Sequence, residues 1–163
     1  MKLSIVYDTR TGNTARMAEY IMEGMLEVEG EEARAFALDA VDEQYVRDSV
    51  ALIVGTPTYN GTLTARLKGW LESAPSKLNV AGKLGGAYAT AAYIHGGGDV
   101  AVQSVLMHLM VSGMLAYSSG AAFGAPVIHY GPVAIAPGLD EFAELFRIYG
   151  RRMAERAAAL GAK

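Results

Sequence analysis

A chain of 163 residues with 52% hydrophobic and 19% charged residues can form the core of one domain, which excludes intrinsic disorder. The formal net charge of -3 and the scattered Lys and Arg residues argue against a nucleic-acid partner. Because the chain has no cysteine, disulfides, thiolate catalysis and iron–sulfur clusters are excluded, and any redox chemistry must come from a bound cofactor.

Two hydrophobic segments bear on membrane association. The N-terminal sequence "MKLSIVYD" contains an apolar run that is too short for a signal peptide. The most hydrophobic window, residues 100–118, is interrupted by polar residues, so a buried helix followed by a strand explains it better than a membrane span. We therefore expect a soluble, cytoplasmic protein without a membrane span and with one domain over residues 1–163.

Short apolar runs alternate with helical patterns along the chain, which is typical of βαβ units and a parallel sheet. The expected strands are "LSIVY" (3–7), "ARAFAL" (33–38), "VALIVGT" (50–56), "LGGAYATA" (84–91) and "MLAYSS" (114–119). Apolar residues at helical spacing predict helices around 18–25, 43–48, 63–71, 100–112 and 142–160. This alternation indicates an α/β fold with a doubly wound sheet.

The segment "GAAFGAPVIHYGPVAIAPG" (120–138) has no helical period and is rich in Gly and Pro. It is long for a plain connection between a strand and a helix, and loops of this length are more often functional or interfacial than idle. We expect it to be a functional loop or part of an interface.

Ligands of open parallel sheets bind beyond the carboxyl ends of the strands. The segments "DTRTGNT" (8–14), "GTPTYNGT" (55–62) and "TAAYIHGGGD" (90–99) follow three of the expected strands. All three are rich in Gly, Thr and amide groups and poor in charge. This composition favours a large, partly apolar ligand with one anionic end.

The first of these segments favours a phosphate site. Its threonines offer hydroxyl groups, Gly12 allows close approach of the backbone, and residues 12–15 carry the free N–H groups of a helix start. The alternative is an ordinary helix cap by Thr11 or Asn13. The chain lacks the glycine–lysine phosphate loop of nucleoside triphosphatases and the glycine pattern of dinucleotide domains, and no aspartate ends the third strand as in a phospho-receiver.

These segments resemble those of known flavoproteins. "TRTGNT" (9–14) resembles the FMN-phosphate loop of flavodoxins, and "GTPTYNGTLTARLKGWL" (55–71) resembles their ring-binding loop and the helix after it. "HGGGD" (95–99) is similar to the third loop of WrbA-type quinone reductases. The resemblance covers almost the whole chain and implies a flavodoxin-like three-layer fold, with five parallel strands in the order 2-1-3-4-5, and FMN as cofactor.

The resemblance also implies the residues that contact FMN. The phosphate would be wrapped by Thr9, Arg10, Thr11, Gly12, Asn13 and Thr14. The isoalloxazine ring would be bordered by Thr56, Pro57, Thr58, Tyr59, Asn60 and Gly61. Its pyrimidine side would be lined by Thr90, Ala91, Ala92, Tyr93, His95, Gly96, Gly97 and Gly98.

Several single residues have two interpretations. Tyr59 and Tyr93 could stack on the flavin or cover the edge of the core. His95 is the candidate catalytic residue, because a loop imidazole can donate to a substrate oxygen, although a solvated loop histidine fits the sequence equally. Asp8 directly precedes the phosphate loop, which is unfavourable unless its carboxylate points away or pairs with a cation such as Arg10.

Other residues fit structural roles better. Asp99 fits an N-cap, Trp70 belongs to the apolar side of its helix, and His108 fits a surface position. His129 lies in the long loop, which could close over the flavin. No cluster of His, Asp and Glu has metal-ligand spacing, so we expect no metal.

Three functions are compatible with these observations. The first is an enzyme that passes electrons from NAD(P)H through FMN to a quinone or a similar acceptor. The second is a one-electron carrier that docks on redox partners, and the third is a flavin-binding module of a larger system. The third loop and the length of residues 120–138 favour the enzyme, and so does the small net charge, because carriers that dock on basic partners use acidic surfaces. By resemblance we expect a homodimer or homotetramer, with residues 120–138 at the interface.

Overall fold

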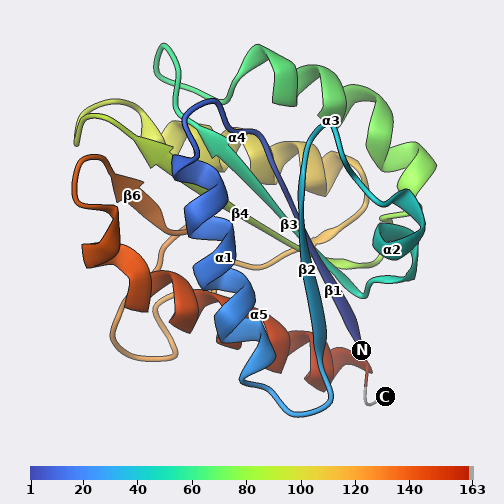
Figure 1. Cartoon of the computed structure of the whole chain (residues 1–163). Coiled ribbons are helices and arrows are strands. Elements are labelled where there is room, and N and C mark those ends of the chain that lie inside the picture. The colour runs from blue at the N-terminus through green and yellow to red at the C-terminus, as the bar shows by residue number, and fades with distance from the viewer. Residues whose placement is uncertain (162–163) are drawn as a thin grey trace.

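A computed structural model describes residues 1–161 as a parallel sheet between two layers of helices (Figure 1). Its main strands are β1 (Lys2–Tyr7), β2 (Glu32–Ala37), β3 (Ala51–Pro57) and β4 (Leu84–Ala91). With the short β5 (Leu115–Ala116), they lie in the order β2-β1-β3-β4-β5. The predicted fold class and strand order are confirmed.

Both faces of the sheet are covered by helices. Helices α1 (Asn13–Leu26) and α5 (Ala143–Gly161) pack on one face, and α2 (Glu43–Asp48), α3 (Ala65–Leu78) and α4 (Gly98–Val111) lie on the other. Successive side chains of a strand point to opposite faces, so Ile53 joins the core under α1 and α5 while Leu52 and Val54 join the core under α3 and α4. This double burial explains the continuous apolar run of β3.

The fifth position of the sheet is occupied by two separate strands. β5 pairs with the first residues of β4, Leu84 and Gly85, whereas β6 (Val133–Ile135) pairs with its last residues, Ala89 to Ala91. The prediction of one strand over 114–119 was wrong in extent, and β6 was missed inside the segment predicted as a loop. The four apolar residues between Pro132 and Pro137 carry too little strand signal for sequence analysis.

The chain between β5 and β6 is attached to α5 by a buried arginine. Arg152 is 9% exposed, and its guanidinium donates to Ser119 Oγ (2.9 Å) and to the carbonyl oxygens of Phe123 (3.0 Å) and Pro126 (3.0 Å). The segment therefore lies beside α5 (Figure 1). Of residues 120–138, the pocket described below is lined by Ala136, which follows β6 at the carboxyl end of β4.

Within residues 1–161, none of the helices combines the length and the apolar character that crossing a bilayer requires.

We expect Arg152→Met to lower the free energy of unfolding by about 3 kcal/mol, because buried carbonyl oxygens lose a charged donor. Urea denaturation of the cofactor-free protein measures this change. The control is Arg151→Met, since the neighbouring Arg151 forms a surface ion pair with Glu27 and should contribute less than about 1 kcal/mol. Equal losses in the two variants would contradict a special role for Arg152.

Candidate functional site

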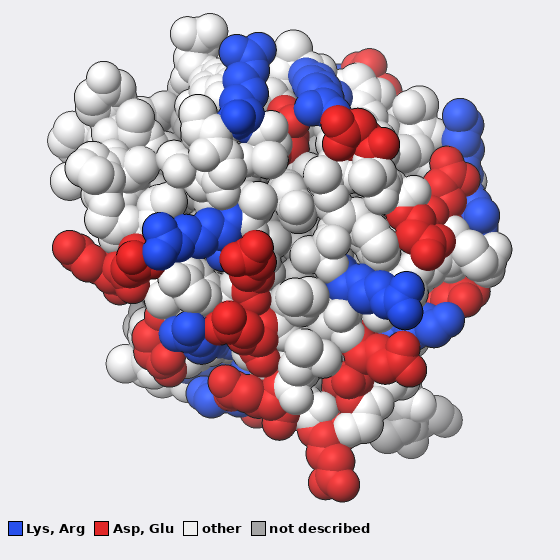
Figure 2. All heavy atoms as spheres, in the orientation of Figure 1, with Lys and Arg blue, Asp and Glu red and all other residues white. Residues whose placement is uncertain are grey.

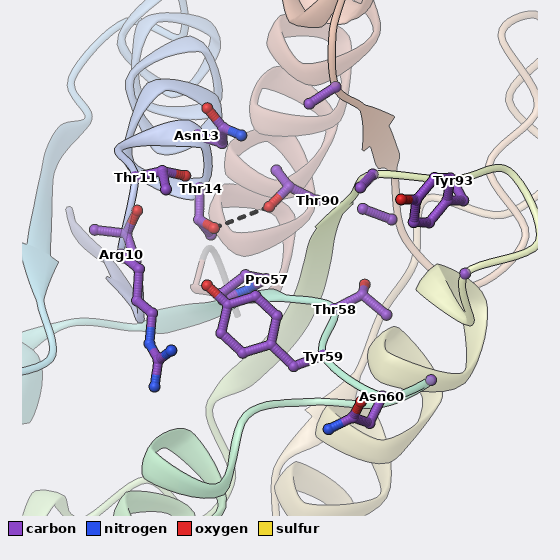
Figure 3. Close-up of a pocket in the computed structure, with 16 residues that line it drawn as sticks. Arg10, Thr11, Asn13, Thr14, Pro57, Thr58, Tyr59, Asn60, Thr90 and Tyr93 are labelled. Carbon is purple, nitrogen blue, oxygen red and sulfur yellow. Dashed lines mark hydrogen bonds between the residues drawn. The ribbon is translucent and has the colours of Figure 1, made fainter.

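A pocket of about 760 Å³ lies at the carboxyl ends of β1, β3 and β4 (Figure 3). This volume is in the range of cofactor sites. Its lining residues come from the loops after these strands and from the end of β6: Thr9, Arg10, Thr11, Asn13, Thr14, Pro57, Thr58, Tyr59, Asn60, Gly61, Thr90, Ala91, Ala92, Tyr93, Gly96 and Ala136. The structure thus brings together the three loops that the sequence predicts to share a ligand.

Some predicted binding residues lie near the pocket without lining it. These are Gly12, Thr56, His95, Gly97 and Gly98. Thr56 is fully buried, and its hydroxyl oxygen accepts from the backbone N–H of Thr64 (3.3 Å). Conversely, Ala136 lines the pocket and was not predicted, because its place depends on the pairing of β6 with β4.

The first loop, which joins β1 to α1, has the conformation of an anion cradle. Gly12 stands at the start of α1 with φ of 87°, and no side chain caps this helix. The predicted alternative, a cap by Thr11 or Asn13, is therefore wrong. A Cβ added to Gly12 would meet no protein atom within 4 Å, so the backbone there faces open space. Free N–H groups and open space at a helix start fit a phosphate group.

The second loop ends in a tight hairpin turn. Tyr59 and Thr62 exchange backbone hydrogen bonds (2.9 and 3.2 Å), and the two residues between them, Asn60 and Gly61, both have positive φ. Asn-Gly is the preferred pair for this two-residue turn. The carbonyl of Gly61 lies against Gly97, where no Cβ would fit, so the glycines of the third loop allow the two loops to touch.

Buried hydroxyl groups support the floor of the pocket. The side-chain oxygens of Thr14 and Thr90 are 3.0 Å apart and join the first loop to the end of β4 (Figure 3). Behind them, the hydroxyl of Tyr88 donates to the carbonyl oxygen of Thr14 (2.9 Å). Burial raises the pKa of Tyr88 well above its usual value, which keeps this hydroxyl protonated as a donor.

Asp8 points away from the phosphate cradle. Its carboxylate is buried and accepts hydrogen bonds from the hydroxyl of Thr64 (2.6 Å) and the guanidinium of Arg66 (3.2 Å). Thr64 is also the N-cap of α3. Asp8 thus joins the end of β1 to the start of α3, and its cation partner is Arg66 rather than the predicted Arg10. The pairing was missed because it spans more than fifty residues of sequence.

Two tyrosines lie at the rim of the pocket. Tyr59 is 36% exposed, and the guanidinium of Arg10 lies 5.2 Å from its ring centroid (Figure 3). Tyr93 is 75% exposed and lines the pocket from the third loop. Both rings are therefore available to a planar ligand, and the distance from Arg10 to Tyr59 fits a cation–π contact that steadies Tyr59.

The three histidines lie outside the pocket lining. His95 is exposed on the third loop, so its catalytic role stays a prediction. His108 contacts the carbonyl of Ser104 within α4 through Nδ1 (2.7 Å), and His129 borders a separate small cavity with Asp99 and Tyr130. Among residues 1–161, no group of three His, Asp or Glu side chains could hold a metal ion.

The fold and the site define a class of protein: a doubly wound domain with a pocket at its strand ends that fits a planar ligand with one phosphate. Comparison with known proteins agrees with this class. The flavodoxin family model matches residues 5–99. A flavodoxin from Clostridium saccharobutylicum is 43% identical over 156 residues, which cover 96% of this chain and 97% of that protein.

More distant matches include enzymes. An NAD(P)H dehydrogenase (quinone) from Aromatoleum aromaticum (strain DSM 19018 / LMG 30748 / EbN1) is 27% identical over 202 aligned positions, which cover 98% of this chain and 97% of that protein. The structure of a WrbA-like flavodoxin from Agrobacterium tumefaciens has a TM-score of 0.81 at 23% identity, covering 97% of this chain and 98% of that one. At this identity the structure supports the fold alone.

The chain belongs to the flavodoxin family, whose cofactor is FMN. The predicted cofactor is thus confirmed, and the open cradle at Gly12 and the aromatic rim fit it.

We expect Asp8→Ala to lower the free energy of unfolding of FMN-free protein by about 2–3 kcal/mol, because Thr64 and Arg66 lose a buried charged acceptor. Asp39→Ala is the matched control, since Asp39 also pairs with Arg66 (3.3 Å) but is 72% exposed and should change stability by less than about 0.5 kcal/mol. Urea denaturation compares the two variants. A loss as small for Asp8 as for Asp39 would show that the buried acceptor has no special weight.

We expect Gly12→Ala to weaken FMN binding at least about tenfold, because the new methyl group enters the cradle and strains a backbone with positive φ. Gly30→Ala is the matched control: Gly30 has φ of 81° and an equally open Cβ position, but it follows the C-terminal end of α1, whereas Gly12 stands at the N-terminal end between the lining residues Thr11 and Asn13. Titration of FMN by its fluorescence measures both dissociation constants. Equal weakening in the two variants would contradict a phosphate site at Gly12.

Proposed function

We propose that this protein is a flavodoxin-type electron carrier without substrate turnover of its own. Bound FMN supplies a flavin that takes up and releases electrons. The observation that carries the proposal is the composition of the pocket wall, which within residues 1–161 contains no histidine and no carboxylate. Its ionisable side chains are Arg10, Tyr59 and Tyr93. A quinone reduced in this pocket would therefore meet no imidazole and no carboxyl group in the pocket wall that could protonate it.

The relatives support the carrier more strongly than the enzyme. The flavodoxin at 43% identity matches this chain along nearly its whole length. The alignment to the quinone dehydrogenase extends over 202 positions, although this chain has 163 residues, so that enzyme has segments with no counterpart here. The missing segments weaken the enzyme interpretation that the sequence analysis favoured.

The two structural features behind that interpretation have other roles in this fold. The glycines of "HGGGD" allow close packing, because Gly97 lies against the Gly61 carbonyl and Gly98 against Val133. The long segment before β6 is held beside α5 by Arg152 and does not close over the pocket, as the sequence analysis considered for it. Both observations leave the rim at Tyr93 open to a partner protein.

The chain's own residues would perform the binding steps of a carrier. Threonine hydroxyls and N–H groups of the first loop would bind the FMN phosphate, and Tyr59, steadied by Arg10, would orient the ring. The exposed rim would leave one edge of the ring within reach of a redox partner. The alternative remains an NAD(P)H-dependent quinone oxidoreductase, as the more distant relatives are named. A cytoplasmic location stays a prediction.

We expect FMN-loaded protein to oxidise NADH and NADPH with benzoquinone no faster than free FMN at the same concentration. Chemically reduced protein should instead transfer its electrons to cytochrome c stoichiometrically in a stopped-flow experiment. An NAD(P)H dehydrogenase (quinone), assayed in parallel, is the positive control. Quinone-dependent turnover far above that of free FMN would contradict the carrier and favour the enzyme, and failure to bind FMN would contradict both.

A further inference from the structure

Charged residues are almost absent from one continuous third of the chain. Counting Lys, Arg, Asp and Glu, Asp99 is the one charged residue between Lys83 and Asp140. In Figure 2, charged side chains crowd over α1 and α5, whereas the upper left, where the loop leading into α4 lies, carries none. Of the chain's 14 Lys and Arg and 17 Asp and Glu residues, all except Asp99 therefore lie in the rest of the protein.

The same part of the chain carries most of the exposed apolar surface. Fourteen large hydrophobic side chains are exposed within residues 1–161, and ten of them lie between residues 93 and 130. They are Tyr93, Ile94, Val100, Met107, Met110, Val111, Leu115, Phe123, Val127 and Tyr130. Concentration of exposed apolar side chains in one region marks an interaction site, whereas single exposed ones need no explanation.

Helix α4 presents an ordered part of this surface. Its exposed residues after Asp99 are Val100, Gln103, Met107, Met110 and Val111, which we call the α4 stripe. They recur at intervals of three and four residues, the spacing with which one helix packs along another. Val111 is 90% exposed and Met107 is 54% exposed. Apart from Gln103, the stripe on the outer side of the helix is thus apolar, like the side that faces the sheet, which is unusual for a helix in water.

The other long helices have charged outer sides. Glu19 and Glu23 are exposed on α1, Glu72 and Lys77 on α3, and Glu144 and Glu155 on α5. The contrast within one molecule indicates that the α4 stripe lacks charge for a reason of its own. A groove of about 430 Å³ between α3 and α4 borders the stripe at Val111 and could accept a flexible methionine side chain.

We propose that the α4 stripe is the contact of a symmetric homodimer, in which α4 packs antiparallel on α4 of a second copy. A two-fold contact brings the same surface of both copies together, so a surface with charges of one sign is repelled by the same charges on the second copy. The stripe has no charge to repel or to bury, and it supplies both halves of an apolar seam. Antiparallel packing also opposes the two helix dipoles and puts the two Asp99 carboxylates at opposite ends of the pair.

The proposed contact gives a homodimer, as the resemblance implies, but it uses a different surface from the one predicted. By resemblance, residues 120–138 were predicted at the interface, but part of that segment is bound to α5 through Arg152. Met107 lies near the middle of the stripe, so the two-fold axis passes close to it and the two Met107 side chains meet. A charge introduced there therefore faces the same charge on the second copy.

Sedimentation velocity of the FMN-loaded protein over a range of concentrations tests this contact. We expect a dimer for the unchanged chain and a dissociation constant at least about tenfold higher for Met107→Lys. Leu26→Lys is the matched control, because Leu26 is 51% exposed at the end of α1 and should leave the dimer intact. A monomer at all concentrations, or equal dissociation in the two lysine variants, would overturn the proposal.

A mixture of Met107→Lys and Met107→Glu proteins tests the symmetry. Each variant alone should dissociate, whereas the mixture should recover a dimer, because lysine and glutamate then meet across the axis. The bound-flavin absorption spectrum of each variant reports whether it is folded, and Val111→Lys replaces Met107→Lys if that variant does not fold. Failure of the mixture to associate while the folded variants dissociate alone would overturn the antiparallel contact at Met107. The outcome does not depend on electron transfer, so it stands apart from the test of the carrier.

Discussion

The three loops above the sheet form one pocket because their backbones come closer than side chains would allow. The carbonyl oxygen of Gly61 occupies the place of a Cβ on Gly97, and the ring of Tyr88 occupies that of a Cβ on Gly55. A larger residue at Gly97 would push the second loop away from the third. A larger residue at Gly55 would push β3 away from Tyr88, whose hydroxyl donates to Thr14 beneath the first loop. The pocket therefore depends on glycine at positions that mostly do not line it.

Asp8 adds a second constraint at the same strand ends. A buried carboxylate is tolerated only when its oxygens are hydrogen-bonded and its charge is paired, and Thr64 and Arg66 meet both needs. Since Thr64 also caps α3, the helix after the flavin loop begins where β1 ends. The loop between β3 and α3 is thus fixed at both ends, and Tyr59 at its tip is steadied by Arg10 from the first loop.

The parts of this structure that sequence analysis predicted are those with strong local signals. Strand β3 is a nearly continuous apolar run, and the first loop carries its threonines and glycine within six residues. Both features can therefore be recognised from a few neighbouring residues. The errors involve contacts between distant residues. β6 is a strand only because β4 offers it a partner, and Arg152 orders a segment about thirty residues before it. Asp8 at the end of β1 pairs with Arg66 of α3, 58 residues further along the chain. No local pattern encodes these pairings.

The pocket and the α4 stripe meet at the start of one helix. The third loop ends where α4 begins at Gly98, and this glycine lies so close to Val133 of β6 that a Cβ would not fit. The position of α4 is therefore fixed from within the molecule, by β6 and by the apolar core beneath it. A partner that packs on the outer side of α4 meets a helix that is already rigidly placed. The stripe can thus serve as a contact without displacing Tyr93 at the rim of the pocket, and association through α4 is compatible with an open edge for electron transfer.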